Sequence, residues 1–279
     1  MQKGKHIVAA NNVTITMDLN GNETPEEVLK IICNKAQIHP DEIVLMWASP
    51  PCETFSRADA CNTTRGHNYR DNSHPERPPK QGPADDEKII KAKEHDNFLP
   101  RLQQMLQADR TRGLTYNFVF ENPNAGLRRR PYMHLQAWPE VVDVIRRTVN
   151  LCAFGHFYKK GTDLWTSLTN WSPQGTTGTG TCDNRCGQGA WGPKSYKHFH
   201  ALGVEPQAEV QGPGVTARRN AMPHMLLQEV MRAARLEGND DQNIVIDLCA
   251  GFRSLENICA AEGLHYVPVD IKYKMAPMV

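Results

Sequence analysis

A cysteine preceded by two prolines is the first residue whose chemistry stands out. Cys52 follows Pro50 and Pro51, shortly after the apolar run 43–47. Prolines fix their own backbone and restrict the residue before them, so this thiol would be held at a defined place. A single cysteine is more often a small buried apolar residue. Its position after a strand and two prolines favours a nucleophile instead.

A carboxyl group stands at the end of a second short apolar run. Residues 116–120 have strand character, and Glu121, Asn122 and Pro123 follow them. The carboxyl ends of parallel strands share one edge of a sheet, where α/β folds bind their ligands. Burial at that edge would raise the pKa of Glu121, which suits a general acid.

The third pattern lies near the end of the chain. The apolar strand 244–248 is followed by Gly251, a helix over 255–262, and Asp270 at the end of the next strand. A glycine turn lets a ligand approach the backbone closely, and an acid about 20 residues further on can bind ribose hydroxyls.

These patterns together resemble the DNA (cytosine-5)-methyltransferase family. Pro50-Pro51-Cys52 with Phe55-Ser56 resembles its nucleophile motif, although Glu53 stands where Gln is usual. Glu121-Asn122 resembles its Glu-Asn pair, with Pro123 in place of Val. The segment 244–271 resembles its cofactor motif, with Arg253 and Ser254 in place of later glycines.

The resemblance implies a covalent mechanism. Cys52 would add to carbon 6 of a flipped-out cytosine, and a protonated Glu121 would bind ring nitrogen 3. Carbon 5 would then take a methyl group from S-adenosylmethionine. Lys160 lies where the family usually has base-contacting Gln and Arg residues, together with Tyr158, Lys159 and Thr162, and would be the third catalytic residue.

The resemblance also implies binding residues. The S-adenosylmethionine site would comprise Asp18, Pro50, Asn220, Ala221, Asp247, Cys249, Ala250, Gly251, Phe252, Arg253, Ser254, Asp270 and Ile271. The DNA-binding residues would be Ser56, Arg57, Arg65, Asn68, Arg70, Asn122, Arg128 and Lys159. For each exposed residue of the long polar segment 57–86, simple solvation is the competing interpretation.

The order of these motifs is unusual for the family. The cofactor motif normally opens the chain, and here it closes it. The segment 219–223 resembles the motif that normally ends these enzymes. The sequence therefore predicts a circular permutation, in which Asp18 ends the third strand and contacts the adenine of the cofactor.

The elements that must position these residues alternate between strand and helix. Strands are predicted at 13–17, 43–47, 116–120, 149–154, 244–248 and 266–269, and helices after Thr24 and at 89–106, 138–147, 222–236 and 255–262. Such alternation predicts an α/β fold with a mainly parallel, Rossmann-like methyltransferase sheet. The domain prediction is a catalytic unit of residues 1–165 and 216–279, with a small inserted target-recognition lobe at 166–215.

The lobe carries a candidate zinc site. Cys182 and Cys186, with His198 or His200, have an acceptable ligand spacing, and free structural thiols are the alternative interpretation. We therefore expect Cys182, Cys186 and His198 to be the ligands.

Composition limits the class of protein. The 279 residues carry 32 basic and 31 acidic side chains, so DNA would be held by local basic clusters rather than by the global field. Uneven cysteine spacing and the lack of a long apolar stretch favour an intracellular monomer without a membrane partner. Two alternatives stay open: an RNA (tRNA) cytosine-5 methyltransferase, and a catalytically silent cofactor- or DNA-binding module.

Overall fold

A computed structural model describes most of the chain. The described residues are 14–19, 23–50, 52, 54–55, 87–156, 159–183, 186–187, 189–191, 196–198, 222–249 and 255–273. The strands are β1 Ile15–Leu19, β2 Ile43–Ala48, β3 Asn117–Pro123, β4 Ile145–Asn150, β5 Gly161–Thr166, β6 Gly189–Trp191, β7 Tyr196–His198, β8 Ile244–Asp247 and β9 His265–Tyr273. The α-helices are α1 Pro25–Ala36, α3 Glu87–Thr111, α6 His224–Glu237 and α7 Glu256–Ala261. Short 3-10 helices are η1 Pro40–Glu42, η3 Gly126–Arg129, η4 Pro131–Met133, η5 Leu135–Ala137, η6 Leu151–Phe154 and η7 Gly175–Thr177.

Seven of the strands form one sheet, in the order β1-β9-β8-β2-β3-β5-β4. The pairs from β1 to β3 are all parallel, whereas β5 runs antiparallel to both β3 and β4. This confirms the predicted α/β fold with a mainly parallel, Rossmann-like sheet. The chain moves to one side of the sheet after β8 and to the other side after β2, so the switch point lies between β8 and β2.

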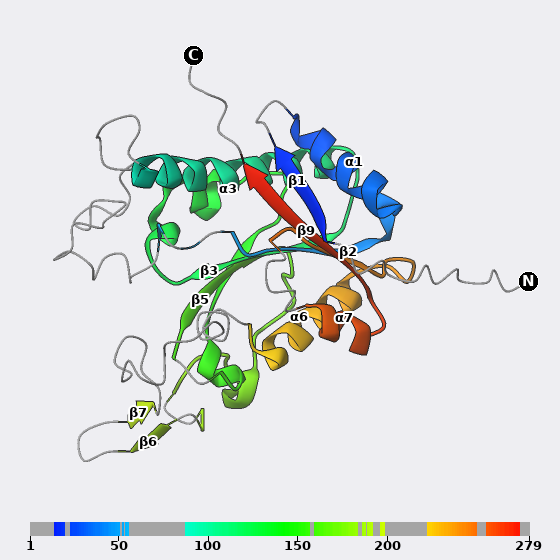
Figure 1. Cartoon of the computed structure of the whole chain (residues 1–279). Helices are drawn as coiled ribbons and strands as arrows, with labels where there is room; N and C mark the ends of the chain where they lie inside the picture. The colour runs from blue at the N-terminus through cyan, green and yellow to red at the C-terminus, as the bar shows by residue number, and fades with distance from the viewer. Residues whose placement is uncertain are drawn as a thin grey trace, which may run out of the picture.

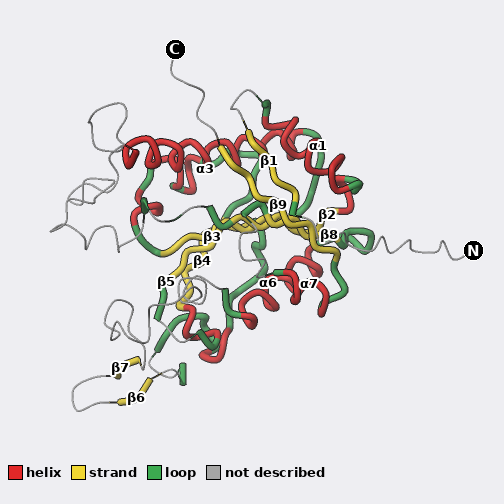
Figure 2. Tube along the Cα trace, in the orientation of Figure 1, coloured by secondary structure: helices red, strands yellow, loops and turns green. Residues whose placement is uncertain are grey.

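Helices cover both faces of the sheet, which gives three layers (Figures 1 and 2). Helices α1 and α3 pack on one face, in a core that includes Leu29, Leu102 and Phe118. Helices α6 and α7 pack on the other face, in a core that includes Val230 and Ile258. Strand β2 is buried along its whole length because both layers cover it.

Local signals explain where α1 begins. Thr24 precedes Pro25, and its backbone N–H donates to the Glu27 carboxylate over 2.6 Å. This bond belongs to a capping box and satisfies a backbone donor at the start of the helix.

The prediction of a helix over residues 138–147 is wrong. Trp138 is followed by Pro139 and turns, and β4 begins at Ile145. The segment 141–145 is rich in β-branched residues, and the strand β5 that pairs with β4 was not predicted. Sheet pairing therefore outweighs the helical spacing of apolar residues. Of the predicted strand 149–154, only residues 149 and 150 are strand, at the end of β4. The rest forms the 3-10 helix η6, which ends at Gly155 with a φ of 87°.

The predicted lobe is described in part. Its hairpin of β6 and β7 forms a separate two-stranded sheet away from the seven-stranded one (Figure 1). Leu168 and Trp171, earlier in the predicted lobe, pack in the same core as α6. The boundaries at 166 and 215 stay a prediction.

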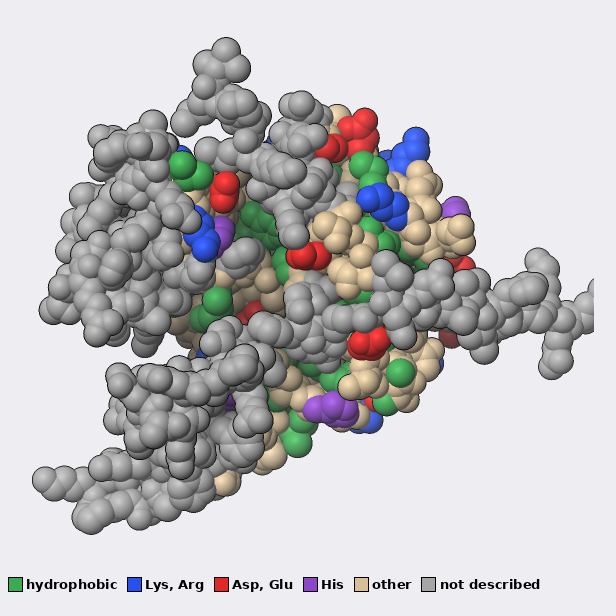
Figure 3. Space-filling model, in the orientation of Figure 1, with side chains coloured by type: hydrophobic (Ala, Val, Ile, Leu, Met, Phe, Trp, Pro, Cys, Tyr) green, Lys and Arg blue, Asp and Glu red, His purple; other side chains and the backbone are tan. Residues whose placement is uncertain are grey.

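The described surface carries charges of both signs. Lys and Arg side chains are interspersed with Asp and Glu on the face that Figure 3 shows, in keeping with the net charge of +1. Within the described part of the chain, no helix combines the length and the apolar character needed to cross a membrane.

Candidate active site

Strands β2 and β3 deliver the predicted nucleophile and acid to one edge of the sheet. The strands are parallel neighbours, and Ala48 at the end of β2 pairs with Phe120. The backbone after Ala48 leads to Cys52, and Glu121 directly follows Phe120. Cys52 is half-buried, and Glu121 is only 7% exposed.

The three residues predicted to be catalytic lie within electrostatic range of one another. Burial raises the pKa of the Cys52 thiol, the Glu121 carboxylate raises it further, and the positive charge of Lys160 lowers it. Lys160 comes from a different part of the chain, directly before β5. The structure therefore brings the sulfur, the carboxyl group and the ammonium group to one place, and their catalytic roles stay predictions.

Glu121 has the surroundings of a carboxyl group that can hold a proton. Burial raises its pKa, while Lys160 and a hydrogen bond with Ser49 oppose the shift. Its Oε1 atom is buried and has no hydrogen-bond partner among the described residues. A buried carboxyl oxygen without a protein partner is placed to pair with a ligand.

Ser49 is a site residue that the sequence analysis missed. The Trp47 indole Nε1–H donates to its hydroxyl oxygen over 2.9 Å, and the hydroxyl is therefore oriented toward Glu121. Its position between a buried strand and the two prolines was the available signal, because a residue there must point into the same edge of the sheet.

The loop that carries Cys52 is held by four contacts. Phe55 donates its N–H to the Cys52 carbonyl over 3.0 Å and accepts the Gly126 N–H over 2.8 Å. The Thr54 hydroxyl lies 2.9 Å from His95 Nδ1 on α3, and the Phe55 ring is buried in the core. A Cβ on Gly126 would lie 3.1 Å from the Phe55 carbonyl oxygen, so this glycine permits a close approach of two backbones.

Asn122 supplies the fourth contact from inside the protein. Its side-chain amide donates to the Pro50 carbonyl over 3.2 Å, and the residue is 1% exposed. This contact ties the end of β3 to the cysteine loop, and the predicted role of Asn122 in DNA binding stays a prediction.

The other predicted DNA-binding residues have different surroundings. Arg128 pairs with Asp163 (Nε to Oδ2, 3.3 Å) and also donates to Asn124, so its guanidinium contacts the fold itself. Lys159 is exposed. The remaining predicted residues, Ser56, Arg57, Arg65, Asn68 and Arg70, lie outside the described part of the chain.

The ends of β8 and β9 border the same edge. Asp247 is 5% exposed, and its carboxylate accepts the Tyr266 hydroxyl over 3.0 Å and the Cys249 N–H over 3.3 Å. Burial raises the pKa of Asp247 to about 6. Cys249 also bridges to Asp270 across the two strands.

Cys249 connects the predicted cofactor region with the acid. Burial is the largest cause that raises the pKa of its thiol. The negative charges of Asp247, Asp270 and Glu121 raise it further. The end of β8 is therefore close to Glu121, as the sequence motifs required.

The structure describes only part of the predicted cofactor set. Pro50 is buried, and Asp270 is half-buried. Asp18 and Ile271 lie in β1 and β9, but their side chains are not described. Ala250, Gly251, Phe252, Arg253, Ser254, Asn220 and Ala221 lie outside the described residues, and so does Tyr158.

A third cysteine lies next to two of the predicted metal ligands. Cys182 and Cys186 lie together, and Cys152 from η6 joins them. The third predicted ligand, His198, lies in β7, where its side chain is not described.

The sheet order and the arrangement at its carboxyl edge define a class, the α/β proteins with a Rossmann-like methyltransferase fold. No protein-family model matches the chain. The chain is 26% identical, over 223 residues, to a protein of Frog virus 3 (isolate Goorha) named "Probable DNA (cytosine-5)-methyltransferase". The similarity covers 78% of this chain and 87% of that relative. The similarity to this viral protein supports the resemblance to the DNA (cytosine-5)-methyltransferases that the sequence motifs indicate.

Proposed function

We propose that this protein methylates carbon 5 of cytosine in DNA. The observation that carries the proposal is the meeting of Cys52, Glu121 and Lys160 at the ends of β2 and β3, next to Cys249 at the end of β8. The name of the viral relative supports DNA as the substrate. A cytosine inside a duplex is out of reach of such a site, so the base would have to leave the stack.

The Cys52 thiolate performs the first step. Its sulfur forms a bond to carbon 6, and the electron pair of the 5,6 double bond moves toward carbon 5, which becomes nucleophilic. Lys160 favours the thiolate that this step needs, because its positive charge lowers the pKa of Cys52. Carbon 5 then takes the methyl group, loses its proton to a base, and the carbon 6–sulfur bond breaks to release Cys52.

Glu121 stabilises the ring during the attack. Its burial and raised pKa favour the protonated carboxyl group, and its unpartnered Oε1 could hydrogen-bond ring nitrogen 3. A hydrogen bond or proton at that nitrogen prevents negative charge from accumulating on the pyrimidine. Ser49 is the positioning residue that holds the carboxyl group through the contact it makes with Trp47.

The residues at the ends of β8 and β9 fit S-adenosylmethionine. Asp270 presents a half-buried carboxylate, which suits ribose hydroxyls, and Asp247 holds the start of the turn through its contact with the Cys249 N–H. The bound cofactor supplies a methyl group on a sulfonium. Asp247, at the end of β8, borders the switch point between β8 and β2, where doubly wound sheets bind ligands, and Asp270 lies on the next strand, β9.

Strand order supports the proposal of a circular permutation. When β8 is numbered first and the chain is followed through β9, β1, β2 and β3, the spatial order of the five strands is 3-2-1-4-5. This is the order of the ordinary doubly wound sheet. The chain would then begin and end between the second and third strands of that sheet.

Trapping of a covalent adduct tests the function. The full chain is incubated with S-adenosylmethionine and a duplex that contains 5-fluorocytosine, whose fluorine prevents the final proton removal. We expect a stable protein–DNA adduct that disappears in Cys52→Ala and persists in Cys33→Ala, a change at a buried cysteine of α1. Methyl transfer to ordinary duplex DNA should fall by about 10²- to 10⁴-fold in Glu121→Gln, as expected for loss of a general acid.

The substrate is tested in the same assay. Fluorinated single-stranded DNA and transfer RNA run beside the duplex. Adducts with RNA alone, or none on any substrate while circular dichroism shows a folded protein, would contradict the proposal.

A further inference from the structure

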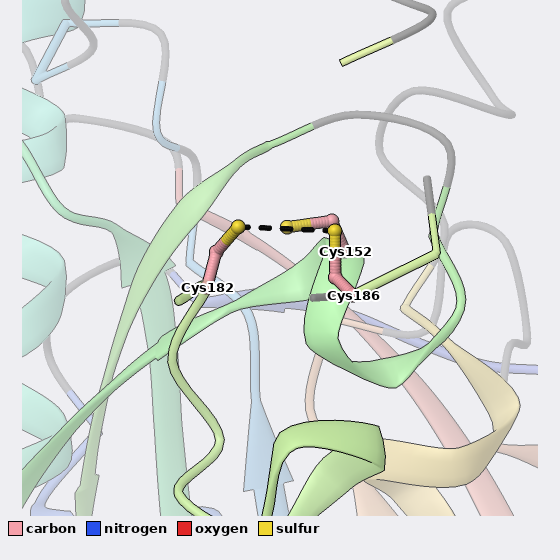
Figure 4. A group of neighbouring side chains, drawn as sticks. All are labelled: Cys152, Cys182 and Cys186. Atoms are coloured by element: carbon pink, nitrogen blue, oxygen red, sulfur yellow. Dashed lines mark hydrogen bonds between the residues drawn. The ribbon is translucent and has the colours of Figure 1, made fainter. Parts of the chain in front are cut away.

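Three cysteines from two distant segments meet beside the catalytic sheet. Cys152 lies in η6, after β4, and Cys182 and Cys186 follow η7. Their three sulfur atoms lie within 4.8 Å of one another (Figure 4). Cys152 is fully buried, Cys186 is 4% exposed and Cys182 is half-buried.

The spacing of the sulfur atoms suits a metal better than a disulfide. The Sγ atoms of Cys182 and Cys186 are 3.8 Å apart, and none of the three residues forms a disulfide. A disulfide would bring two sulfurs to about 2.05 Å. Zinc–sulfur bonds of about 2.3 Å in tetrahedral geometry separate two sulfur ligands by about 3.8 Å.

Backbone contacts place the cysteines independently of the thiols. Asn150 donates its N–H to the Gly180 carbonyl over 2.9 Å, and its side-chain oxygen accepts the Cys182 N–H over 2.8 Å. The Thr176 hydroxyl donates to the Ala153 carbonyl over 3.0 Å. The two segments are therefore held on both sides of Cys152, as a preorganised ligand set requires.

The two segments pack closely where Gly175 lies against η6. A Cβ on Gly175 would lie 2.4 Å from the Ala153 carbonyl oxygen, and this glycine has a φ of 56°. A larger residue there would have to displace the backbone of η6. The sequence thus contains a glycine where the second segment crosses the turn that carries Cys152.

We propose that the thiolates of Cys152, Cys182 and Cys186 bind one zinc ion. Binding exchanges three thiol protons for one Zn²⁺, so the group changes from neutral to a net charge of −1 before a fourth ligand is added. Among the described residues, no fourth His, Cys, Asp or Glu belongs to the group. This ligand set differs from the one predicted from the sequence because it includes Cys152, which lies outside the predicted lobe.

The ion would join the start of the predicted lobe to the catalytic sheet. Leu151, next to Cys152, donates its N–H to the Lys160 carbonyl over 2.9 Å. The zinc site would therefore also stabilise the backbone at Lys160, whether or not the protein methylates DNA.

Metal content tests the site directly. The full chain is purified under reducing conditions with zinc in the medium, freed of excess metal, and analysed by inductively coupled plasma mass spectrometry. We expect about one zinc per chain, a more than tenfold loss in Cys152→Ser, and retention in Cys33→Ser. Cys152→Ser is decisive because a site built only from the lobe would keep its metal.

Cobalt binding to the unmodified chain covers the case in which Cys152→Ser does not fold. Metal-free protein titrated with Co²⁺ should show a sulfur-to-cobalt charge-transfer band with an intensity typical of three thiolates, and Zn²⁺ should abolish it. Absence of zinc and of this band would overturn the proposal. A Cys182–Cys186 disulfide, seen as a mass loss of about 2 Da in protein purified under reducing conditions, would overturn it as well.

Discussion

At the scale of single residues, the proposed chemistry depends on two opposing charges near one sulfur. Cys52 must be a thiolate to attack, yet burial and the Glu121 carboxylate both raise its pKa. Lys160 acts in the opposite direction. The same low-dielectric surroundings that raise the pKa of Glu121 therefore also raise that of the nucleophile, and the positive charge of Lys160 opposes the shift at Cys52.

Alkylation of Cys52 by iodoacetamide measures this balance without DNA. The rate should rise with pH as the thiolate forms. Lys160→Met should move the midpoint to higher pH, because the thiolate loses a favourable charge. Glu121→Gln should move it to lower pH, because an unfavourable charge is gone. Mass spectrometry of the Cys52 peptide gives the rate.

The exposed neighbour Lys159 provides the matched control for that experiment. Lys159→Met removes a lysine one position away and should leave the midpoint nearly where it is in the unmodified protein. Equal midpoints in Lys160→Met and Lys159→Met would show that Lys160 does not act on the sulfur.

At the scale of elements, the end of β8 combines a functional position with a cost in stability. Asp247 is buried, and its pKa rises from 3.8 to about 6. The folded state binds a proton more tightly than the unfolded chain, so the stability from this group is lost as pH rises through that range. A shift of about two units corresponds to about 3 kcal/mol above pH 6.

Asp247→Asn should therefore stabilise the protein in a pH-dependent way. The amide can still accept the Cys249 N–H, and it carries no charge to bury. We expect a higher free energy of unfolding than for the unmodified protein, with an advantage that grows by about 1 kcal/mol between pH 5 and pH 7.5. Urea titrations at the two pH values measure it.

Asp240→Asn is the control for the loss of one carboxylate, because Asp240 lies on an exposed turn after α6. If Asp247→Asn raised the free energy of unfolding by the same amount at both pH values, burial would not raise the pKa of Asp247.

The sequence predicts elements well where one residue pattern decides the structure. The runs that form β2, β3 and β8 are short, apolar and bounded by turn residues, and each is predicted within three residues of its bounds. Strand β5 has the sequence GTDLWT, whose character comes from antiparallel partners on both sides. Such pairing cannot be seen in a local pattern.

The candidate site follows the same division. Cys52 and Glu121 could be predicted because strand ends and prolines mark them locally. His95 and Cys152 could not, since their roles depend on contacts with residues far along the chain, such as Thr54 for His95. Cys152 reads as an ordinary apolar residue of η6 until the fold brings Cys182 to it.

At the scale of the whole molecule, the two ends of the described chain lie on neighbouring strands. Strands β1 and β9 pair in parallel, from Ile15 opposite Val269 to Leu19 opposite Tyr273. Six residues follow Tyr273 and fourteen precede Ile15, so a joined connection would contain twenty. A parallel crossover needs about a dozen residues or more, and twenty extended residues span up to about 66 Å.

A relinked chain tests the proposed permutation. Val279 is fused to Met1, and new ends are opened before Thr216, at the predicted lobe boundary. Because the sheet of the relinked protein would have the ordinary strand order, we expect it to fold and to methylate DNA within about tenfold of the original rate. Circular dichroism melting and methyl transfer are the measurements. The same fusion opened between Leu45 and Met46 breaks the central strand β2 and should not fold. If both relinked chains failed alike, the junction between β9 and β1 would be incompatible with the fold, and the proposed permutation would lose its structural basis.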